Sequence, residues 1–211
     1  SQKSKLKMWK NQLNNLDDIS SVFIDFLENK INHLPWSDHL SSETEIIKDK
    51  LIELNKKHIF TINSQPKINA LPSNHPNAWG PKGGYIYQKA YLEFFISKSK
   101  LDSILEKINS EYTYCAINLE GKLLTNYDNS INALTWGVFP NNEIIQPTIA
   151  DIESFKIWKD EAFALWIIEW AKIYDPDSES YKLLKMIHQE YYLVFIVDHN
   201  FIDGDIFQIF N

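Results

Sequence analysis

Apolar residues recur every three to four positions in five segments of the chain, and this period predicts amphipathic helices. Asp17 or Asp18 fits the N-cap of the first helix, and Ser42 with Glu45 forms the S-x-x-E pattern of a capping box at the start of the second. Asp175-Pro176-Asp177 is expected to end the longest helix. The expected helices lie at about 17–27, 42–54, 101–108, 152–174 and 181–189.

Other segments are rich in aromatic and β-branched residues and predict strands. Glu120-Gly121 is placed to join two of these segments as a hairpin, whereas residues 64–84 hold four prolines and three glycines and predict a long irregular loop. The expected strands lie at about 59–63, 85–96, 112–119, 122–126, 133–139 and 191–197.

Helices and strands interleave without a regular βαβ period, and hairpin signals are mixed with covering helices. We therefore expect an α+β fold, with a mostly antiparallel β-sheet core flanked by helices in a single domain. Residues 1–16 are expected to be an N-terminal tail or linker, and residues 17–211 to form the domain.

Charge and hydropathy exclude several classes of partner. The net charge is −7 and the lysines are scattered, so no nucleic-acid partner is expected. The longest apolar runs, such as Tyr191–Val197, are too short to span a bilayer, and no secretory signal is visible, so no membrane partner is expected. Cys115 is the one cysteine, which indicates a reducing, cytoplasmic compartment and a small buried side chain. The chain begins without Met, so we expect it to be cut from something longer.

The residues alone indicate no reaction. The six histidines have no metal-ligand spacing, and C-x-x-C, G-x-S-x-G and Walker motifs do not occur. The run Gly80–Gly84 lacks the G-K-[ST] ending of a phosphate loop and fits a tight turn. We therefore expect no catalytic residue and no metal site in this chain.

Six ordered runs are highly specific, and the match to which they belong extends from about Asp17 to Phe201. They resemble the C-terminal, S-adenosylmethionine-binding regulatory half of eukaryotic methylenetetrahydrofolate reductases. The runs are residues 61–66, 79–85, 88–95, 132–140, 143–148 and 155–166.

The resemblance implies a regulatory role. In that family an N-terminal barrel with bound flavin reduces methylenetetrahydrofolate with a nicotinamide cofactor. The C-terminal half binds S-adenosylmethionine, inhibits the barrel and makes homodimer contacts; S-adenosylhomocysteine competes without imposing inhibition. The domain thereby controls the supply of methyltetrahydrofolate for methionine synthesis. Because this chain contains none of the barrel, we expect it to be catalytically silent and free of flavin.

The same resemblance implies a ligand site. A carboxylate can meet the sulfonium or ammonium cation or accept from ribose hydroxyls, whereas hydroxyl groups can satisfy a carboxylate or adenine nitrogens. The N-terminus of the second helix could also offer N–H groups to a carboxylate. Each residue has a structural interpretation too: a favourable helix-end charge, a cap, a β-branched strand residue or a turn. The implied contacts are Glu43, Thr44, Thr61, Ser64, Thr135 and Thr148.

Four positions depart from the family pattern. His58 and Ala70 replace usual glycines, which affects local turn geometry. Phe195 and His199 stand where asparagine is usual, near the C-terminus, where they could alter a contact with the partner subunit or the barrel.

Two alternatives compete with allosteric binding. The chain could be a structural dimerisation module that has lost its ligand, because its 14% aromatic content suits an interface. It could also be an independent methyltransferase, although it lacks the Gly-rich strand-to-helix turn of the usual methyltransferase fold. Titration with S-adenosylmethionine separates binding from the structural role, and a product assay tests for the enzyme.

Overall fold

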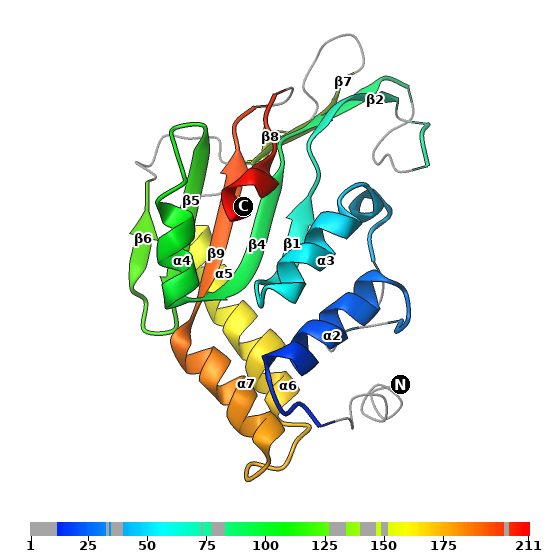
Figure 1. The fold of residues 1–211 in the computed structure, drawn as a ribbon. Helices are drawn as coiled ribbons and strands as arrows, with labels where there is room; N and C mark the ends of the chain where they lie inside the picture. The colour runs from blue at the N-terminus through cyan, green and yellow to red at the C-terminus, as the bar shows by residue number, and fades with distance from the viewer. Residues whose placement is uncertain are drawn as a thin grey trace.

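The structure is a computed structural model that places a central sheet between helices on both faces (Figure 1). For residues 134–139, 147–148 and 152 only the backbone is described. The residues that the structure describes are 12–32, 34, 40–72, 74–76, 83–126, 134–139, 147–148, 152–200 and 203–211.

The large sheet has the strand order β1-β4-β9-β5-β6, and every neighbouring pair is antiparallel. β9 lies at its centre and all eight of its residues are buried. Because both faces of the sheet are covered at β9, residues 191–197 are apolar or aromatic throughout, and apolar residues do not alternate with polar ones. The expected α+β fold with a mostly antiparallel sheet is confirmed. The strands are β1 Phe60–Gln65, β4 Tyr91–Ser97, β5 Tyr112–Asn118, β6 Leu123–Thr125 and β9 Tyr191–Asp198.

Two apolar clusters, one on each face, hold the layers together. Successive residues of β9 point to opposite faces of the sheet and pack into different clusters: Leu193 lies in the first cluster and Val194 in the second. Five elements pack with the first cluster: α2 Leu16–Leu27, α5 Ile152–Phe163, the π-helical turn η3 Ala164–Ile168, α6 Glu169–Ala171 and α7 Glu179–Glu190. Three further elements pack with the second: α3 Lys48–Lys56, α4 Lys98–Leu105 and the 3₁₀ helix η4 Ile206–Phe210. Leu27 at the end of α2 also belongs to the second cluster.

A smaller antiparallel sheet with the order β2-β3-β7-β8 continues from the large one (Figure 1). The predicted strand 85–96 is two strands, which divide at Lys89-Ala90 and belong to different sheets. The predicted loop 64–84 contains β2, although residues 73 and 77–82 lie outside the described residues. The strands are β2 Ile68–Pro72, β3 Tyr85–Gln88, β7 Leu134–Phe139 and β8 Pro147–Thr148.

Two predicted helix starts are wrong. Asn15 caps α2 by accepting from the Asp18 backbone N–H, and the Asp18 side chain completes the capping box, so the cap lies two or three residues before the predicted Asp17 or Asp18. Ser42 does not begin an α-helix: residues Ser42–Ile46 form a short 3₁₀ helix, η1, and α3 starts only at Lys48. The long predicted helix exists, but a π-helical turn interrupts it.

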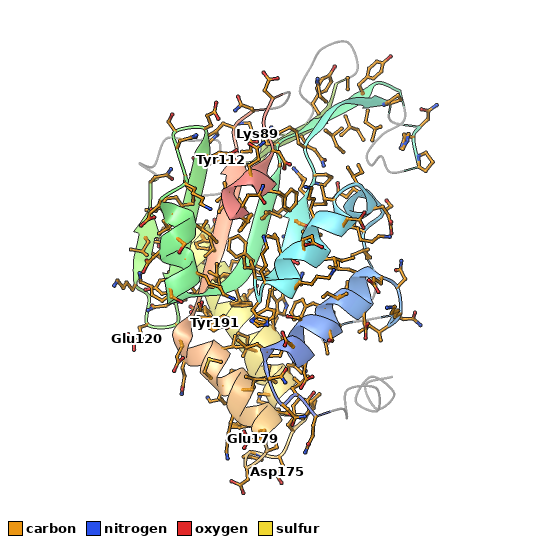
Figure 2. All side chains as sticks on the ribbon, viewed as in Figure 1. Lys89, Tyr112, Glu120, Asp175, Glu179 and Tyr191 are labelled. Atoms are coloured by element: carbon orange, nitrogen blue, oxygen red, sulfur yellow. The ribbon has the colours of Figure 1, made fainter. Side chains whose placement is uncertain are left out.

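The predicted hairpin is confirmed, with Glu120 at its tip (Figure 2). Cys115 is buried as expected, and burial raises the pKa of its thiol. Leu13 is also buried, and its backbone N–H donates to Ser180 Oγ at 2.6 Å, so ordered packing begins upstream of Leu16. The domain boundary at residue 17 stays a prediction, because residues 1–11 lie outside the described part.

The structure shows the conformation or the contacts of the four positions that depart from the family pattern. His58 and Ala70 both have φ near +61°, the left-handed region that glycine adopts without strain. Phe195 is buried and packs against Tyr91, with ring centroids 5.6 Å apart. The ring of His199 contacts the Thr113 hydroxyl. Both C-terminal substitutions therefore make contacts within this chain.

Candidate functional site

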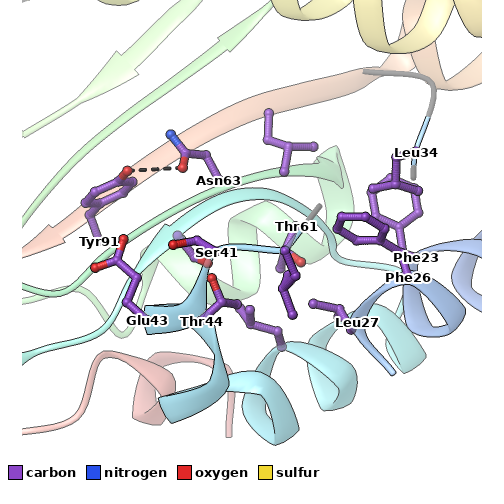
Figure 3. Close-up of a pocket in the computed structure, with 14 residues that line it drawn as sticks. Phe23, Phe26, Leu27, Leu34, Ser41, Glu43, Thr44, Thr61, Asn63 and Tyr91 are labelled. Carbon is purple, nitrogen blue, oxygen red and sulfur yellow. Dashed lines mark hydrogen bonds between the residues drawn. The ribbon is translucent and has the colours of Figure 1, made fainter. Parts of the chain in front are cut away.

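A pocket of about 210 Å³ lies where α2, η1 and the edge strand β1 meet (Figure 3). Apolar side chains form one end, and polar side chains form the other. Four of the six predicted ligand residues line it: Glu43, Thr44, Thr61 and Ser64. The remaining lining residues are Phe23, Phe26, Leu27, Leu34, Leu40, Ser41, Leu51, Ile62, Asn63 and Tyr91.

β1 supplies four consecutive lining residues because it is an edge strand with an irregular register. Thr61 is opposite Phe94 and Asn63 is opposite Glu93, so Ile62 is the extra residue of a bulge. A bulge re-aims the side chains around it, and bulges are common beside functional sites. The edge position leaves one side of this strand facing η1 and α2 instead of another strand.

The Glu43 carboxylate lies at the polar end, near Tyr91 (Figure 3). Burial raises the pKa of Glu43, and a hydrogen bond from Gln88 Nε2 to Glu43 Oε2 at 3.3 Å opposes that shift. The Gln88 side chain is fully buried and also donates to the Pro66 carbonyl at 2.7 Å. Glu43 is thus a partly desolvated carboxylate whose position is fixed by a buried amide.

Thr61 is held by a buried asparagine. Asn55 Nδ2 donates to Thr61 Oγ1 at 2.8 Å and to the Leu51 carbonyl at 2.9 Å. Ser20 Oγ donates to the Asn55 carbonyl at 2.6 Å, which ties α2 to the same junction. Because Thr61 Oγ1 accepts from Asn55, its own hydrogen remains available as a donor.

A second group of polar side chains begins at Tyr91, which lines the pocket. The Tyr91 hydroxyl donates to Asn63 Oδ1 at 3.1 Å, and Asn63 Nδ2 donates to Glu93 Oε1 at 3.3 Å. Trp158 Nε1, from α5, donates to Glu93 Oε2. Glu93 is 7% exposed, and burial raises its pKa to about 7 although both hydrogen bonds favour the charged form.

Thr135 and Thr148 lie on neighbouring strands of the small sheet. Leu134 is opposite Thr148 and Thr135 is opposite Pro147, so the two threonines are one register step apart. On its other side β7 pairs with β3, where Trp136 is opposite Gln88. Since Gln88 contacts Glu43, the backbone brings Thr135 close to the polar end of the pocket.

Sequence reasoning missed several residues that shape the site. Tyr91, Asn63 and Glu93 all lie inside the runs that carried the family resemblance. Glu93 had a signal of its own, since it is the one charged residue in the apolar strand Tyr91–Ser97. Asn55 had none, because an asparagine near a helix end is ordinarily a solvated residue.

Within the described residues, no group of three or more histidine, cysteine or acidic side chains is placed to hold a metal ion. In the same part of the chain, no helix is both long and apolar enough to cross a membrane.

Comparison with known proteins gives a consistent result. The family profile described as "MTHFR, SAM-binding regulatory domain" matches residues 1–211. "Methylenetetrahydrofolate reductase (NADH) 1" of Zea mays is 46% identical over 208 residues, and its namesake in Arabidopsis thaliana is 47% identical over 208. "Methylenetetrahydrofolate reductase 1" of Schizosaccharomyces pombe is 47% identical over 201 residues. The matches cover 96%, 96% and 92% of this chain but only 35%, 35% and 33% of those relatives, so the chain spans about a third of their length.

Proposed function

This chain belongs to the family of S-adenosylmethionine-binding regulatory domains of methylenetetrahydrofolate reductase, and from that premise we propose that the pocket between η1, β1 and α2 is its S-adenosylmethionine site. The observation that carries the proposal is the convergence of four implied contacts on one pocket. Glu43 and Thr44 come from η1, and Thr61 and Ser64 come from β1.

The chemistry of the pocket fits the ligand. Phe23 and Phe26 offer ring faces at the apolar end, which suits adenine. Glu43 at the polar end suits the sulfonium, the ammonium or the ribose hydroxyls, and Thr44, Thr61 and Ser64 supply further hydroxyl partners. We propose that the amino-acid part of the ligand extends from Glu43 towards Thr135 and Thr148, because Thr135 is next to Trp136, which is opposite Gln88 in the β3–β7 ladder.

The proposal extends to the larger protein. S-adenosylmethionine binding would inhibit a flavin-dependent catalytic barrel, and S-adenosylhomocysteine would compete without inhibiting. A homodimer and a cytoplasmic location complete the proposal, and exposed Ile157 and Leu165 on α5 and η3 provide apolar surface for a partner. The chain itself would carry no flavin and no reductase activity, and a flavin absorbance band in the purified chain would contradict this.

Thermal unfolding with each ligand tests the binding proposal. A ligand that binds only the folded state stabilises it by about 2.7 kcal/mol at a hundredfold excess over Kd. We expect both S-adenosylmethionine and S-adenosylhomocysteine to raise the melting temperature, whereas adenosine monophosphate at the same concentration should act far less. No shift with either ligand at millimolar concentration would favour the structural dimerisation module instead.

A further inference from the structure

We propose that Glu93 is a positioning residue for this pocket: through Asn63 it fixes Tyr91 as a hydrogen-bond acceptor towards the ligand, so that affinity depends on the charge of Glu93. The inference rests on the proposed function. It adds to that function a residue behind the pocket wall that determines which hydrogen-bonding group of a ligand Tyr91 accepts.

The direction of each hydrogen bond follows from the donors available. An ionised carboxylate only accepts, and an indole N–H only donates. Glu93 therefore accepts from Trp158 Nε1 on one oxygen and from Asn63 Nδ2 on the other. With its amide nitrogen turned to Glu93, Asn63 must present its oxygen to Tyr91.

Tyr91 consequently uses its one hydrogen inside the protein. Its hydroxyl donates to Asn63 Oδ1, which leaves the lone pairs of the phenolic oxygen to face the pocket. Figure 3 shows the Tyr91 hydroxyl and the Glu43 carboxylate at the same end of the pocket. This end is therefore rich in acceptors, and it selects an amine, ammonium or hydroxyl donor on the ligand.

Protonation of Glu93 reverses the direction of the hydrogen bonds that join Glu93, Asn63 and Tyr91. Trp158 cannot accept, so the added proton must lie on the oxygen that faces Asn63. Asn63 then turns its amide to accept it and directs Nδ2 at Tyr91, whose hydrogen is released towards the pocket. A donor on the ligand would now meet a donor on the protein. Because burial raises the pKa of Glu93 to about 7, this reversal falls within the accessible pH range.

Other titratable groups do not replace Glu93 in this role. Burial is the largest cause of the Glu93 shift, followed by the hydrogen bonds from Trp158 and Asn63. Tyr91 faces both carboxylates, and burial together with Glu93 and Glu43 raises its pKa, so it stays protonated. β1 carries no titratable side chain. The charged residues on the other elements packed against β4 are Glu153, Lys156, Lys159, Asp160 and Glu161 on α5, Lys98, Lys100 and Asp102 on α4, and Asp198 on β9. Within the described part of the chain, all of these except Glu161 and Lys100 form ion pairs, and Lys100 donates to the Lys57 carbonyl.

The test is calorimetric titration of the chain with S-adenosylmethionine from pH 6 to pH 8.5, for wild type and Glu93→Gln. The glutamine nitrogen must face Asn63, since Trp158 only donates, so this variant holds the reversed order at every pH. We expect Glu93→Gln to bind about tenfold more weakly than wild type at pH 8.5 and to come within about twofold of it at pH 6. Taking the ratio of the two Kd values at each pH removes the titration of the ligand itself.

Three further measurements separate positioning from folding. Tyr91→Phe removes the hydroxyl that accepts from the ligand. Neither this variant nor Glu93→Gln then presents an acceptor at position 91, so the ratio of their two Kd values should not change with pH. Glu120→Gln, at the exposed hairpin tip, should match wild type throughout. The Trp158 indole N–H resonance should titrate with a midpoint near pH 7 in wild type only.

A Kd ratio between wild type and Glu93→Gln that stays constant with pH, in folded proteins that bind, would overturn the Glu93 inference and leave the proposed function intact. Folded wild-type chain that binds no S-adenosylmethionine at any pH would overturn both.

Discussion

At the scale of single residues, two carboxylates define the polar end of the pocket by different routes. Glu43 lines the pocket, and only Gln88 opposes its desolvation. Glu93 lies behind the wall and acts through Asn63 and Tyr91. The first offers charge to a ligand directly, whereas the second sets the direction of a neutral hydrogen bond.

Glu43→Gln should weaken S-adenosylmethionine binding by about one to two decades if the carboxylate meets a cation, because charged hydrogen bonds contribute about 1.5–3 kcal/mol. The pKa of Glu43 is raised by burial, so its charge, and with it this contribution, is lost as the pH falls through that raised value. Calorimetry with both ligands measures the effect. A larger loss for S-adenosylmethionine than for S-adenosylhomocysteine identifies the sulfonium, since only the former carries it.

The matched control for this prediction is Glu45→Gln. Glu45 belongs to the same 3₁₀ helix, is exposed and pairs with Lys48 at 2.9 Å, so it shares the local charge but not the pocket. It should bind like wild type. Equal affinities for wild type and a folded Glu43→Gln protein would remove Glu43 from the site.

Residue-level prediction from sequence reached the pocket only through family resemblance. Without the family, the position of Glu43 indicates only a favourable charge at a helix end, and that of Thr61 only a β-branched strand residue. The second group of polar residues was not predictable, because Asn63 and Glu93 meet only across the β1–β4 ladder, 30 positions apart. Thr135 and Thr148 are placed by backbone register, and their ligand roles stay predictions.

At the scale of elements, two residues in the left-handed region show why glycine is usual at positions 58 and 70 in the family. His58 is the C′ residue that ends α3: the Ile59 N–H bonds to the Leu54 carbonyl and the His58 N–H to the Asn55 carbonyl, the pattern of a Schellman motif. The cost of the positive φ at His58 is offset in part by a side-chain contact, since His58 Nε2 lies 2.6 Å from Asp17 Oδ1. Ala70 is the extra residue between Asn69 and Leu71, where the β2–β3 register shifts.

Ala70→Gly should raise the free energy of unfolding by about 0.5–1 kcal/mol. An L-residue at φ +61° is strained and glycine is not, while the greater freedom of glycine in the unfolded chain offsets part of that gain. Urea unfolding measures the change. Ala90→Gly, at a buried position without positive φ, should lower stability instead. A loss of stability in Ala70→Gly would show that the bulge tolerates alanine without strain.

Elements with a strong apolar period were predictable, and their ends were not. α7 and the hairpin of β5 and β6 lie where the pattern placed them. The division of 85–96 into β3 and β4 escaped prediction because Lys89-Ala90 contains no proline or glycine to mark it. The Ala90 carbonyl instead accepts from the Asp198 N–H at 2.9 Å, a contact 108 positions away in the sequence.

At the scale of the whole molecule, the pocket lies at an edge of the large sheet. Helices cover both faces of the central strands, so all of β9 and the five inner residues of β4 are buried, while β1 keeps one side for η1 and α2. The small sheet continues from the β1–β4 pair and carries the two remaining candidate threonines. Residues of α2, η1 and β1 line the pocket together, so a ligand that contacts all three elements could shift how they are arranged.

The central claim is that S-adenosylmethionine or its homocysteine analogue binds between η1, β1 and α2. A crystal structure of this chain grown with S-adenosylhomocysteine tests it most directly. We predict ligand density in the pocket, with adenine against Phe23 and Phe26 and a ligand donor within hydrogen-bond distance of Glu43. Ligand density at another surface, with Glu43 and Thr61 contacting only protein and solvent, would contradict the account.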